Sequence, residues 1–267
     1  MLAFFNTKTG RGVALALALL GIVALGYWAV ITLILLVAAA CMLEILSFQA
    51  MTKVSDGTYG AFFIQMLIVW MGAYSAVRVL GDHDIWTIMV IVAAVYVENA
   101  AAQIFGKRFG RTKLFPRYSP NKTVEGAAWG WVFGSVAGVV ALGLAWWFGG
   151  FGDQIMVNWK EWLTIVVIAP PLAEIGDWLE SRLKRLVRVK DSGELVAASP
   201  SRIIRIIGLS AVFGRQGGAL DKTDSLWAVM LVAYPTLAIS WWVGVVVVLG
   251  VVAYIVGASM AETIRHR

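Results

Sequence analysis

Residues 13–46 read VALALALLGIVALGYWAVITLILLVAAACMLEIL, and this apolar run decides the class of fold. A membrane crossing takes about 20 apolar residues, with about 17 as a working minimum. The run is too long for one crossing and just long enough for two, with the predicted turn at Gly26-Tyr27-Trp28. Because it extends well beyond the short apolar core of a signal peptide, we interpret it as a retained pair of helices.

The composition of the whole chain also indicates a membrane protein. Of its 267 residues, 60% are apolar and only 14% are charged, and the mean hydropathy is +0.80. Soluble domains are about 45–50% apolar and about 25% charged. These values exclude a soluble globular enzyme and a disordered chain. The single cysteine, Cys41, excludes an intrachain disulfide, and with only two histidines we do not expect catalysis built on histidine.

The other apolar runs predict six further crossings, and they cover residues 61–80, 85–105, 124–148, 162–178 and 226–258. The last run, like the first, is long enough for two crossings, with a turn between Pro235 and Trp242. With both termini in the cytoplasm, all of the 22 Lys and Arg residues except Arg78 and Lys160 lie on the cytoplasmic side. This distribution obeys the positive-inside rule. We therefore predict an all-α, polytopic inner-membrane protein with about eight transmembrane helices.

The chain shows no internal repeat and no low-complexity linker, so residues 1–267 are expected to form a single membrane-embedded domain. Its parts are N-terminal helices in 13–105, polar segments and helices in 106–225, and C-terminal helices in 226–267. The net charge of +6 would suggest nucleic acid as a partner of a soluble protein. In a membrane protein it indicates contact with anionic membrane lipids instead, and we expect no nucleic-acid partner.

The first polar segment covers residues 106–126 and is rich in Lys and Arg. Within it, Ser119 is a good helix N-cap, and Pro120 suits the first helical position. Glu125 would then lie early in the helix, where the helix dipole favours a negative charge. By itself this pattern predicts a membrane helix that follows a basic loop at the lipid surface.

Carboxylates mark the second polar segment. Asp177 and Glu180 are three residues apart, which places them on one face of a helix, and Asp221 and Asp224 repeat this spacing before the next crossing. Carboxylates at membrane depth are costly and indicate a functional site by default. Ion pairs between Glu180 and the basic residues one turn later would also explain part of the pattern.

Together these residue types suit phosphate chemistry. Carboxylates from two helices can hold Mg²⁺, which prefers oxygen ligands. Lys and Arg contact phosphates, and the turn at Gly217-Gly218 would let backbone N–H groups approach an anion. Phosphoryl or nucleotidyl transfer needs little beyond positioning and charge neutralisation. An ion transporter with carboxylates in the membrane is an open alternative at this point.

Three blocks resemble the motifs of the CDP-diacylglycerol synthases, also called phosphatidate cytidylyltransferases. Residues 119–126, SPNKTVEG, resemble S-P-x-K-T-x-E-G. Residues 176–193, which begin GDWLES and end KDSG, resemble G-D-x-x-E-S-x-x-K-R…K-D-S-G, and residues 220–225, LDKTDS, resemble L-D-R-x-D-S. The resemblance implies a multi-helical, commonly dimeric membrane enzyme with its active site open to the cytoplasm. The implied reaction joins CTP and phosphatidate to give CDP-diacylglycerol and pyrophosphate.

The resemblance also implies roles for individual residues. Asp177 and Asp221 would hold the catalytic Mg²⁺ with help from Asp224, and a second cation is left open. Lys122 and Lys190 would act on the phosphates as catalytic residues. The residues implied in substrate binding are Ser119, Thr123, Glu125, Glu180, Ser181, Arg185, Gly217, Gly218 and Lys222.

Three positions depart from the family pattern. Gln216 replaces the usual histidine, Lys222 replaces the arginine of L-D-R, and Asn99, beside Glu98, replaces a membrane aspartate. An insertion at 194–212 also separates the second block from the glycine pair, and it contains a predicted interfacial helix. These departures leave three alternatives: a CTP-dependent polyprenol or dolichol-type kinase, an inactive relative with a scaffold role, and the transporter.

Overall fold

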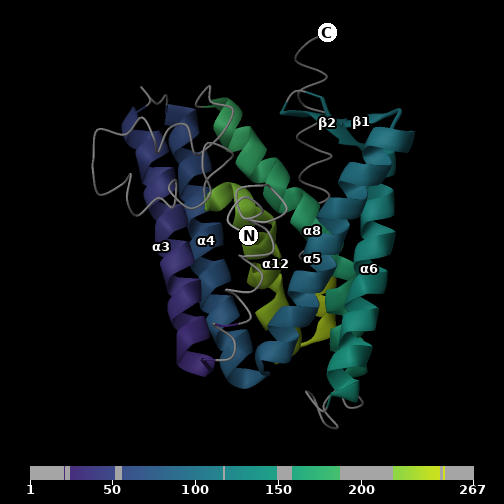
Figure 1. Cartoon of the computed structure of the whole chain (residues 1–267). Coiled ribbons are helices and arrows are strands. Elements are labelled where there is room, and N and C mark those ends of the chain that lie inside the picture. The colour runs from purple at the N-terminus through teal and green to yellow at the C-terminus, as the bar shows by residue number, and fades with distance from the viewer. Residues whose placement is uncertain are drawn as a thin grey trace, which may run out of the picture.

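The computed structural model describes residues 21, 25–51, 56–116, 118–148, 158–186, 219–246 and 249. Its long helices alternate in direction along the bundle (Figure 1). They are α3 (Tyr27–Met51), α4 (Asp56–Asp82), α5 (Ile85–Phe109), α6 (Val124–Trp147), α8 (Trp159–Leu186) and α12 (Leu220–Ala238). A hairpin of β1 (Lys113–Phe115) and β2 (Ser119–Thr123) joins α5 to α6 at one end of the bundle.

Five of these helices, α3, α4, α5, α6 and α8, are long and apolar enough to cross a membrane. This confirms a helical, multi-pass membrane protein, to which the short hairpin adds two strands. Both predicted breaks within long apolar runs are also confirmed. The backbone turns at Gly26, whose φ of 93° suits glycine, and α12 ends at Ala238 before a further helical segment starts at Trp241. The remaining crossings of the predicted eight involve residues outside the described ranges.

The start of α6 differs from the prediction. Ser119 and Pro120 lie in β2, which pairs with β1 in an antiparallel ladder, so the expected helix cap at Ser119 is wrong. The cap is Thr123, whose Oγ1 accepts a hydrogen bond from the Gly126 N–H at 3.2 Å. Threonine offers the same capping chemistry as serine, and proline is tolerated at the edge of a sheet. Glu125 lies in the first turn of α6, as expected.

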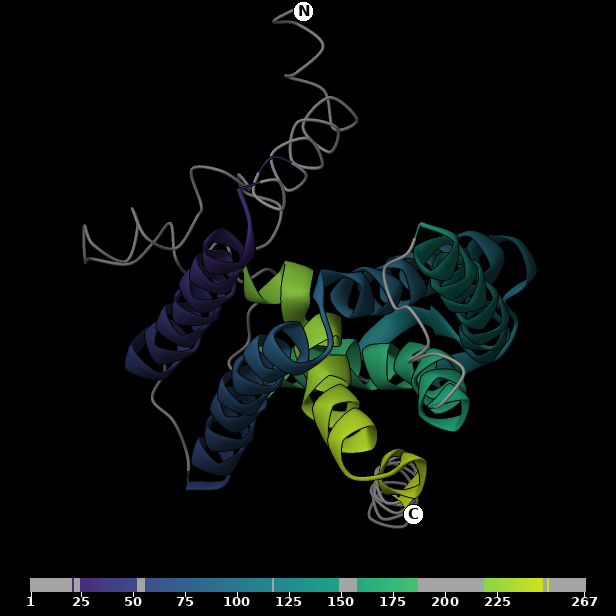
Figure 2. The ribbon, with the colours of Figure 1, turned by 90° about the horizontal axis from the view of Figure 1, so that it is seen from below.

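α12 lies in the middle of the bundle. Seen from below, it runs between α4 and the group formed by α5, α6 and α8 (Figure 2), and it packs against both α4 and α8. α8 is enclosed as well. Of the most apolar 18-residue stretch of each helix, 61% is buried in α8 but only 17% in α6. The outer helix α6 therefore presents most of its surface to lipid, whereas α8 and α12 form the interior.

Two consecutive prolines, Pro170 and Pro171, lie inside α8. A proline has no N–H to donate to the carbonyl four residues earlier, so Pro171 leaves the Val167 carbonyl without its usual helical partner. The indole Nε1–H of Trp131, from α6, donates to this carbonyl oxygen at 2.9 Å. A side chain from the neighbouring helix therefore satisfies the backbone group that the proline frees.

A row of buried glycines brings α5 and α6 together, and its members are Gly126, Gly130, Gly134 and Gly138. A Cβ added at Gly134 would lie 2.8 Å from the Cβ of Glu98 and 2.9 Å from the carbonyl oxygen of Ala94. Such contacts are too short for any side chain, so the four-residue spacing permits a backbone approach typical of membrane helices. This close packing fixes the position of Glu98.

We predict that Gly134→Ala lowers the free energy of unfolding by about 1–3 kcal/mol, because the added methyl overpacks the α5–α6 contact. The matched control is Gly143→Ala in the same helix, where an added Cβ meets nothing within 4 Å. Alanine favours a helix over glycine, so the control should be neutral or slightly stabilising. Unfolding in detergent micelles, followed by circular dichroism, measures both variants. Equal losses of stability would contradict the packing argument.

Candidate active site

Three carboxylates meet between α8 and α12. They belong to Asp177 and Glu180 of α8 and to Asp224 of α12, and one oxygen from each lies within 4.8 Å of the others. Glu180 and Asp224 are only 1% and 5% exposed, whereas Asp177 is half-buried. The predicted common face of Asp177 and Glu180 is therefore present. We call Asp177, Glu180 and Asp224 the carboxylate cluster.

Gly176 allows the two helices to approach closely enough for this cluster to form. A Cβ at this position would lie 2.7 Å from the Asp224 carbonyl oxygen and 2.9 Å from the Ser225 Cα. No other residue type fits without moving α8 away from α12. The glycine directly before Asp177 thus has a packing reason for its place in the motif.

Lys122 enters the site from β2. Its Nζ lies 2.6 Å from Asp177 Oδ2 and 2.9 Å from Glu174 Oε1. Burial lowers the pKa of the Lys122 ammonium, but the two carboxylates outweigh burial and hold the pKa above its ordinary value. The ammonium therefore stays protonated and neutralises part of the acidic site.

Lys184 neutralises the other side of the site. Its Nζ donates to Asp221 Oδ1 at 2.6 Å and also forms an ion pair with Glu180, one turn earlier in α8. Asp221 therefore faces Lys184, while Asp224, on the next turn of α12, joins Asp177 and Glu180. This arrangement differs from the expectation that Asp177 and Asp221 together would form the centre of the metal site.

Two glutamates that the motifs do not identify as site residues also belong to the site. Glu174 lies one turn before Asp177 and pairs with Lys122. The spacing of three that identifies Glu180 would have identified Glu174 too, had it been applied one turn earlier. Glu98 of α5 lies near Glu174, is 1% exposed, and its Oε2 has no hydrogen-bond partner among the described residues.

The predicted substrate-binding residues divide between the cluster and its supports. The Ser181 hydroxyl donates to Asp177 Oδ1 at 3.3 Å, so this side chain belongs to the site. Thr123 caps α6, and Glu125 accepts hydrogen bonds from the backbone N–H groups of Arg111 and Thr112 at 3.0–3.1 Å. These last two residues hold the hairpin in place.

The remaining predicted residues lie at the edge of the site or outside the described ranges. The Arg185 Nε–H donates to the Tyr118 carbonyl oxygen at 3.3 Å, which links the end of α8 to the hairpin. Ser119 lies in β2, and Lys222 is exposed on the first turn of α12. The predicted residues outside the described ranges are Lys190, Gln216, Gly217, Gly218 and the insertion at 194–212.

Aromatic contacts fix the hairpin, and with it Lys122, on α8. The ring of Trp178 lies 5.5 Å from that of Phe115 and 6.3 Å from that of Tyr118. The Arg182 guanidinium lies over the other aromatic surface that Trp178 offers, 5.7 Å from the ring centroid. Because Trp178 directly follows Asp177, the hairpin and the carboxylate cluster are held by the same turn of α8.

The departure at Asn99 also has a structural counterpart. Its side-chain Nδ2 lies 3.5 Å from Ser225 Oγ, next to Asp224, so the amide links α5 to α12. The buried carboxylate of neighbouring Glu98 faces Glu174 instead. Glu98 therefore supplies the acidic group of α5 at this depth, and Asn99 supports the helix that carries Asp224.

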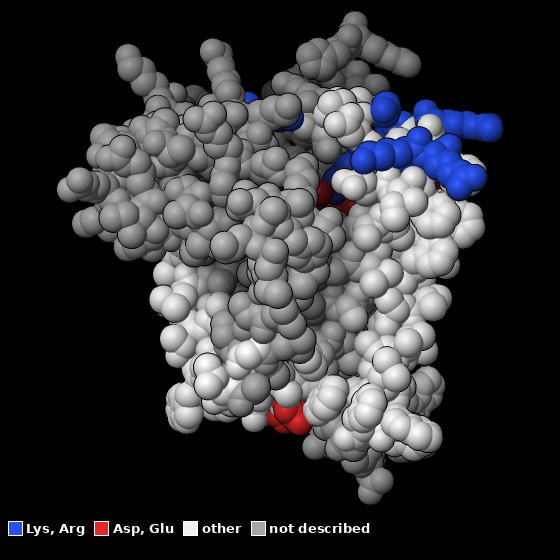
Figure 3. All heavy atoms as spheres, in the orientation of Figure 1, with Lys and Arg blue, Asp and Glu red and all other residues white. Residues whose placement is uncertain are grey.

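Positive charge covers this end of the molecule. Figure 3 shows Lys and Arg gathered at the hairpin end, with acidic atoms visible in a recess beneath them. The exposed basic residues of this end include Lys107, Arg108, Arg111 and Lys113. At the opposite end the visible charge is acidic. The cluster is thus a negative site below a positive rim.

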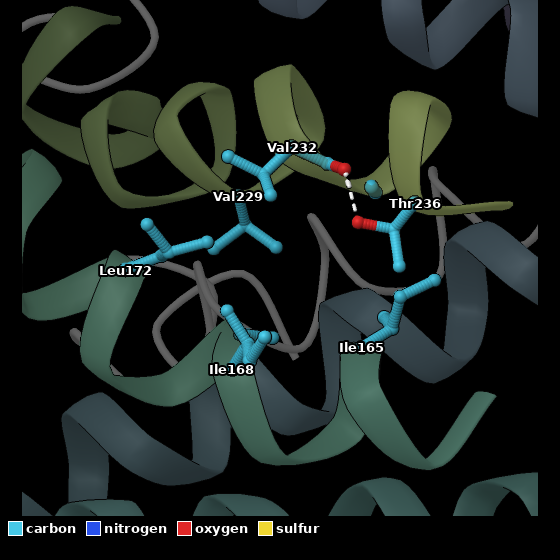
Figure 4. Close-up of a pocket in the computed structure, with 8 residues that line it drawn as sticks. Ile165, Ile168, Leu172, Val229, Val232 and Thr236 are labelled. Atoms are coloured by element: carbon cyan, nitrogen blue, oxygen red, sulfur yellow. Dashed lines mark hydrogen bonds between the residues drawn. The ribbon is translucent and has the colours of Figure 1, made fainter. Parts of the chain in front are cut away.

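The small cavity between α8 and α12 is separate from the carboxylate cluster. Its volume is about 10 Å³, and Ile165, Ile168, Leu172, Val229 and Val232 line it (Figure 4). This is about the volume that one water molecule needs, and the lining is apolar. The cavity is therefore a dry packing defect, too small for an acyl chain or a nucleotide.

The carboxylate cluster fits a divalent cation. Mg²⁺ takes oxygen ligands, and the cluster offers three carboxylates on two rigid helices. Glu180 Oε1 is buried and has no hydrogen-bond partner within the part of the chain that the structure describes. A buried carboxylate oxygen in this state is costly, and a bound cation would satisfy it.

A helical membrane bundle with a buried site of carboxylates and lysines at one end defines a membrane enzyme suited to phosphate-bearing substrates. Residues 53–199 match the sequence model of the Cytidylyltransferase family, and the chain belongs to this family of nucleotidyltransferases.

Curated relatives give the same family. The chain is 27% identical over 207 residues to the phosphatidate cytidylyltransferase of Bacillus subtilis, which covers 76% of this chain and 68% of the relative. It is 30% identical over 190 residues to that of Staphylococcus haemolyticus, with 70% and 62% covered. The values for Thermotoga maritima are 29% over 180 residues, with 66% and 58% covered. The chain thus spans less than two thirds of the length of the last two relatives. No solved structure matches it.

We predict that Lys122→Met lowers the free energy of unfolding by about 3 kcal/mol, because it leaves buried acidic groups without their cation. This is the lower end of the range for a buried pair, since the Asp177 side chain is 31% exposed. Lys222→Met, at an exposed position, is the matched control and should leave stability unchanged. Denaturant titration in detergent compares the two. A Lys122→Met protein as stable as the control would show that Lys122 does not neutralise the site.

Proposed function

We propose that the protein is a phosphatidate cytidylyltransferase, which converts CTP and phosphatidate into CDP-diacylglycerol and pyrophosphate. Family membership and the printed activity of the curated relatives support this function. The observation that carries the proposal is the carboxylate cluster, contacted by Lys122 from the SPNKTVEG block. The structure brings together residues from all three sequence blocks, which are far apart along the chain.

The chemistry requires no histidine. A phosphate oxygen of phosphatidate attacks the α-phosphorus of CTP, the bond between this phosphorus and the bridging oxygen breaks, and pyrophosphate leaves. The attacking phosphate is already an anion, so no base has to remove a proton. The described part of the site accordingly consists of carboxylates and lysines, with no histidine among them. Positioning and charge neutralisation supply most of the catalysis in such transfers.

We place Mg²⁺ at Asp177, Glu180 and Asp224, where it would neutralise phosphate charge and orient the nucleotide. Asp221 keeps Lys184 beside Glu180 through its ion pair. The proposal thus makes Asp224 a direct ligand and gives Asp221 the task of holding a lysine. A second cation is not needed for this arrangement.

The lysines and the basic rim would bind the anionic substrates. Lys122 and Lys184 lie against the carboxylate cluster and can contact phosphates at its edge. Lys190, outside the described ranges, would add to them from the KDSG block. The exposed basic residues of the hairpin end would raise the local concentration of CTP and phosphatidate by electrostatic attraction.

We infer that the hairpin end faces the cytoplasm of a bacterial inner membrane. Cytoplasmic loops carry an excess of Lys and Arg, and in the described part this excess lies at the hairpin end. CTP is a cytoplasmic nucleotide, so this orientation also gives the substrate access. Both termini in the cytoplasm, eight crossings and a homodimer complete the proposal.

We predict that Asp177→Asn and Asp224→Asn each lower kcat by more than about 100-fold, because both remove a carboxylate from the cation site. Asp82→Asn is the matched control, since Asp82 lies at the far end of α4 in an exposed ion pair with Arg78. The assay uses purified protein with labelled CTP, phosphatidate and Mg²⁺, and follows CDP-lipid and pyrophosphate.

The same assay distinguishes the alternatives. A phosphorylated lipid formed with release of CDP would identify a lipid kinase. If no divalent cation supports the formation of CDP-lipid, the protein is not a cytidylyltransferase for this substrate. Near-normal turnover of either cluster variant would overturn the proposed metal site.

A further inference from the structure

α12 begins without a cap of its own. The first N–H groups of a helix have no partner within the helix, and a side chain, water or ligand has to satisfy them. The N-cap residue is Ala219, which offers no side-chain acceptor. Ala219 and Leu220 are 1% and 0% exposed, so water does not reach their N–H groups.

Glu44, from α3, supplies the missing acceptors. The Ala219 N–H donates to Glu44 Oε1 at 2.7 Å, and the Leu220 N–H donates to Oε2 at 2.9 Å. Each carboxylate oxygen therefore satisfies one backbone donor. The negative charge also lies at the positive end of the α12 dipole, which is the favourable position.

The surroundings of Glu44 make this contact specific. Glu44 is 0% exposed and lies among buried apolar residues that include Ile45, Leu183 and Trp227. A carboxylate in such a place is costly unless hydrogen bonds compensate for the lost water. Two backbone N–H groups at one helix end provide this compensation only if α12 starts at this point.

A second link joins the same face of α3 to the same turn of α12. The Thr223 hydroxyl donates to the Ala219 carbonyl oxygen at 2.8 Å, and Cys41 Sγ lies 3.3 Å from Thr223 Oγ1. Because the hydroxyl proton is already used, the thiol is the donor in the second contact. Cys41 and Glu44 are three residues apart, so one face of α3 holds the first turn of α12 at two points.

This turn carries the acidic residues of the site. Asp221 directly follows Leu220, and Asp224 lies one residue beyond Thr223. We propose that Glu44 is a positioning residue, which fixes the start of α12 so that Asp224 reaches Asp177 and Glu180. This inference rests on the proposed function of the carboxylate cluster. Glu44 precedes residue 53, where the match to the family begins, so the family match assigns it no role.

The test compares Glu44→Gln with the unaltered protein. Glutamine has the same size, but its amide offers one acceptor oxygen and turns an NH₂ group toward a backbone N–H. Loss of such a supporting contact weakens metal binding by about 10- to 100-fold. We expect a shift of this size in the Mn²⁺ dissociation constant, measured by electron paramagnetic resonance on folded protein. The Mg²⁺ concentration for half-maximal activity should rise in parallel.

Ser47→Ala in α3 is the matched control. Ser47 is also buried, but its hydroxyl donates to the Leu43 carbonyl of its own helix at 2.7 Å. Both metal constants should stay unchanged in this variant. Thr223→Val removes the second link and should weaken Mn²⁺ binding in the same direction as Glu44→Gln, which covers the case that Glu44→Gln does not fold.

A purely structural role for Glu44 would lower the amount of folded protein but leave the Mn²⁺ dissociation constant of the folded fraction unchanged. That result, or an unchanged constant in Thr223→Val when Glu44→Gln does not fold, overturns the inference. If the unaltered protein binds Mn²⁺ but makes no CDP-diacylglycerol, the proposed function fails while the Mn²⁺ comparison still decides the role of Glu44.

Discussion

The contact between α8 and α12 at Gly176 is the constraint on which the candidate site depends. The backbone of Asp224 lies where a side chain at position 176 would be, and this approach brings the carboxylates of two helices within reach of one cation. Other contacts support it from three directions. The hairpin rests on Trp178, α5 reaches Ser225 through Asn99, and α3 holds the start of α12.

Acidic groups packed this closely repel one another, and burial strengthens the repulsion. The protein compensates with two lysines from different elements, Lys122 of β2 and Lys184 of α8, each of which bridges two carboxylates. Their ammonium groups balance only part of the acidic charge. The remaining negative charge attracts a divalent cation, while the basic rim above attracts phosphates. One site thus suits both the metal and the anionic substrates of a cytidylyltransferase.

Patterns within one segment predict local features well here. Apolar runs indicate the membrane helices and the break at Gly26, and a spacing of three finds acids that share a helix face. Contacts between distant segments are beyond such patterns. Which aspartate of α12 joins the cluster depends on Lys184 of another helix. Glu44 lies in an apolar run, and its partners are backbone N–H groups 175 and 176 residues later, so no local motif marks it.

The central claim is that α8 and α12 together hold one divalent cation, and affinity cleavage tests it most directly. Fe²⁺ replaces Mg²⁺ in the folded protein, ascorbate and peroxide generate hydroxyl radicals at the bound iron, and mass spectrometry locates the cut bonds. We expect cuts in both helices, near 177–180 in α8 and near Asp224 in α12, and their loss when excess Mg²⁺ competes. Cuts confined to one of these helices, or found only elsewhere, would contradict the account.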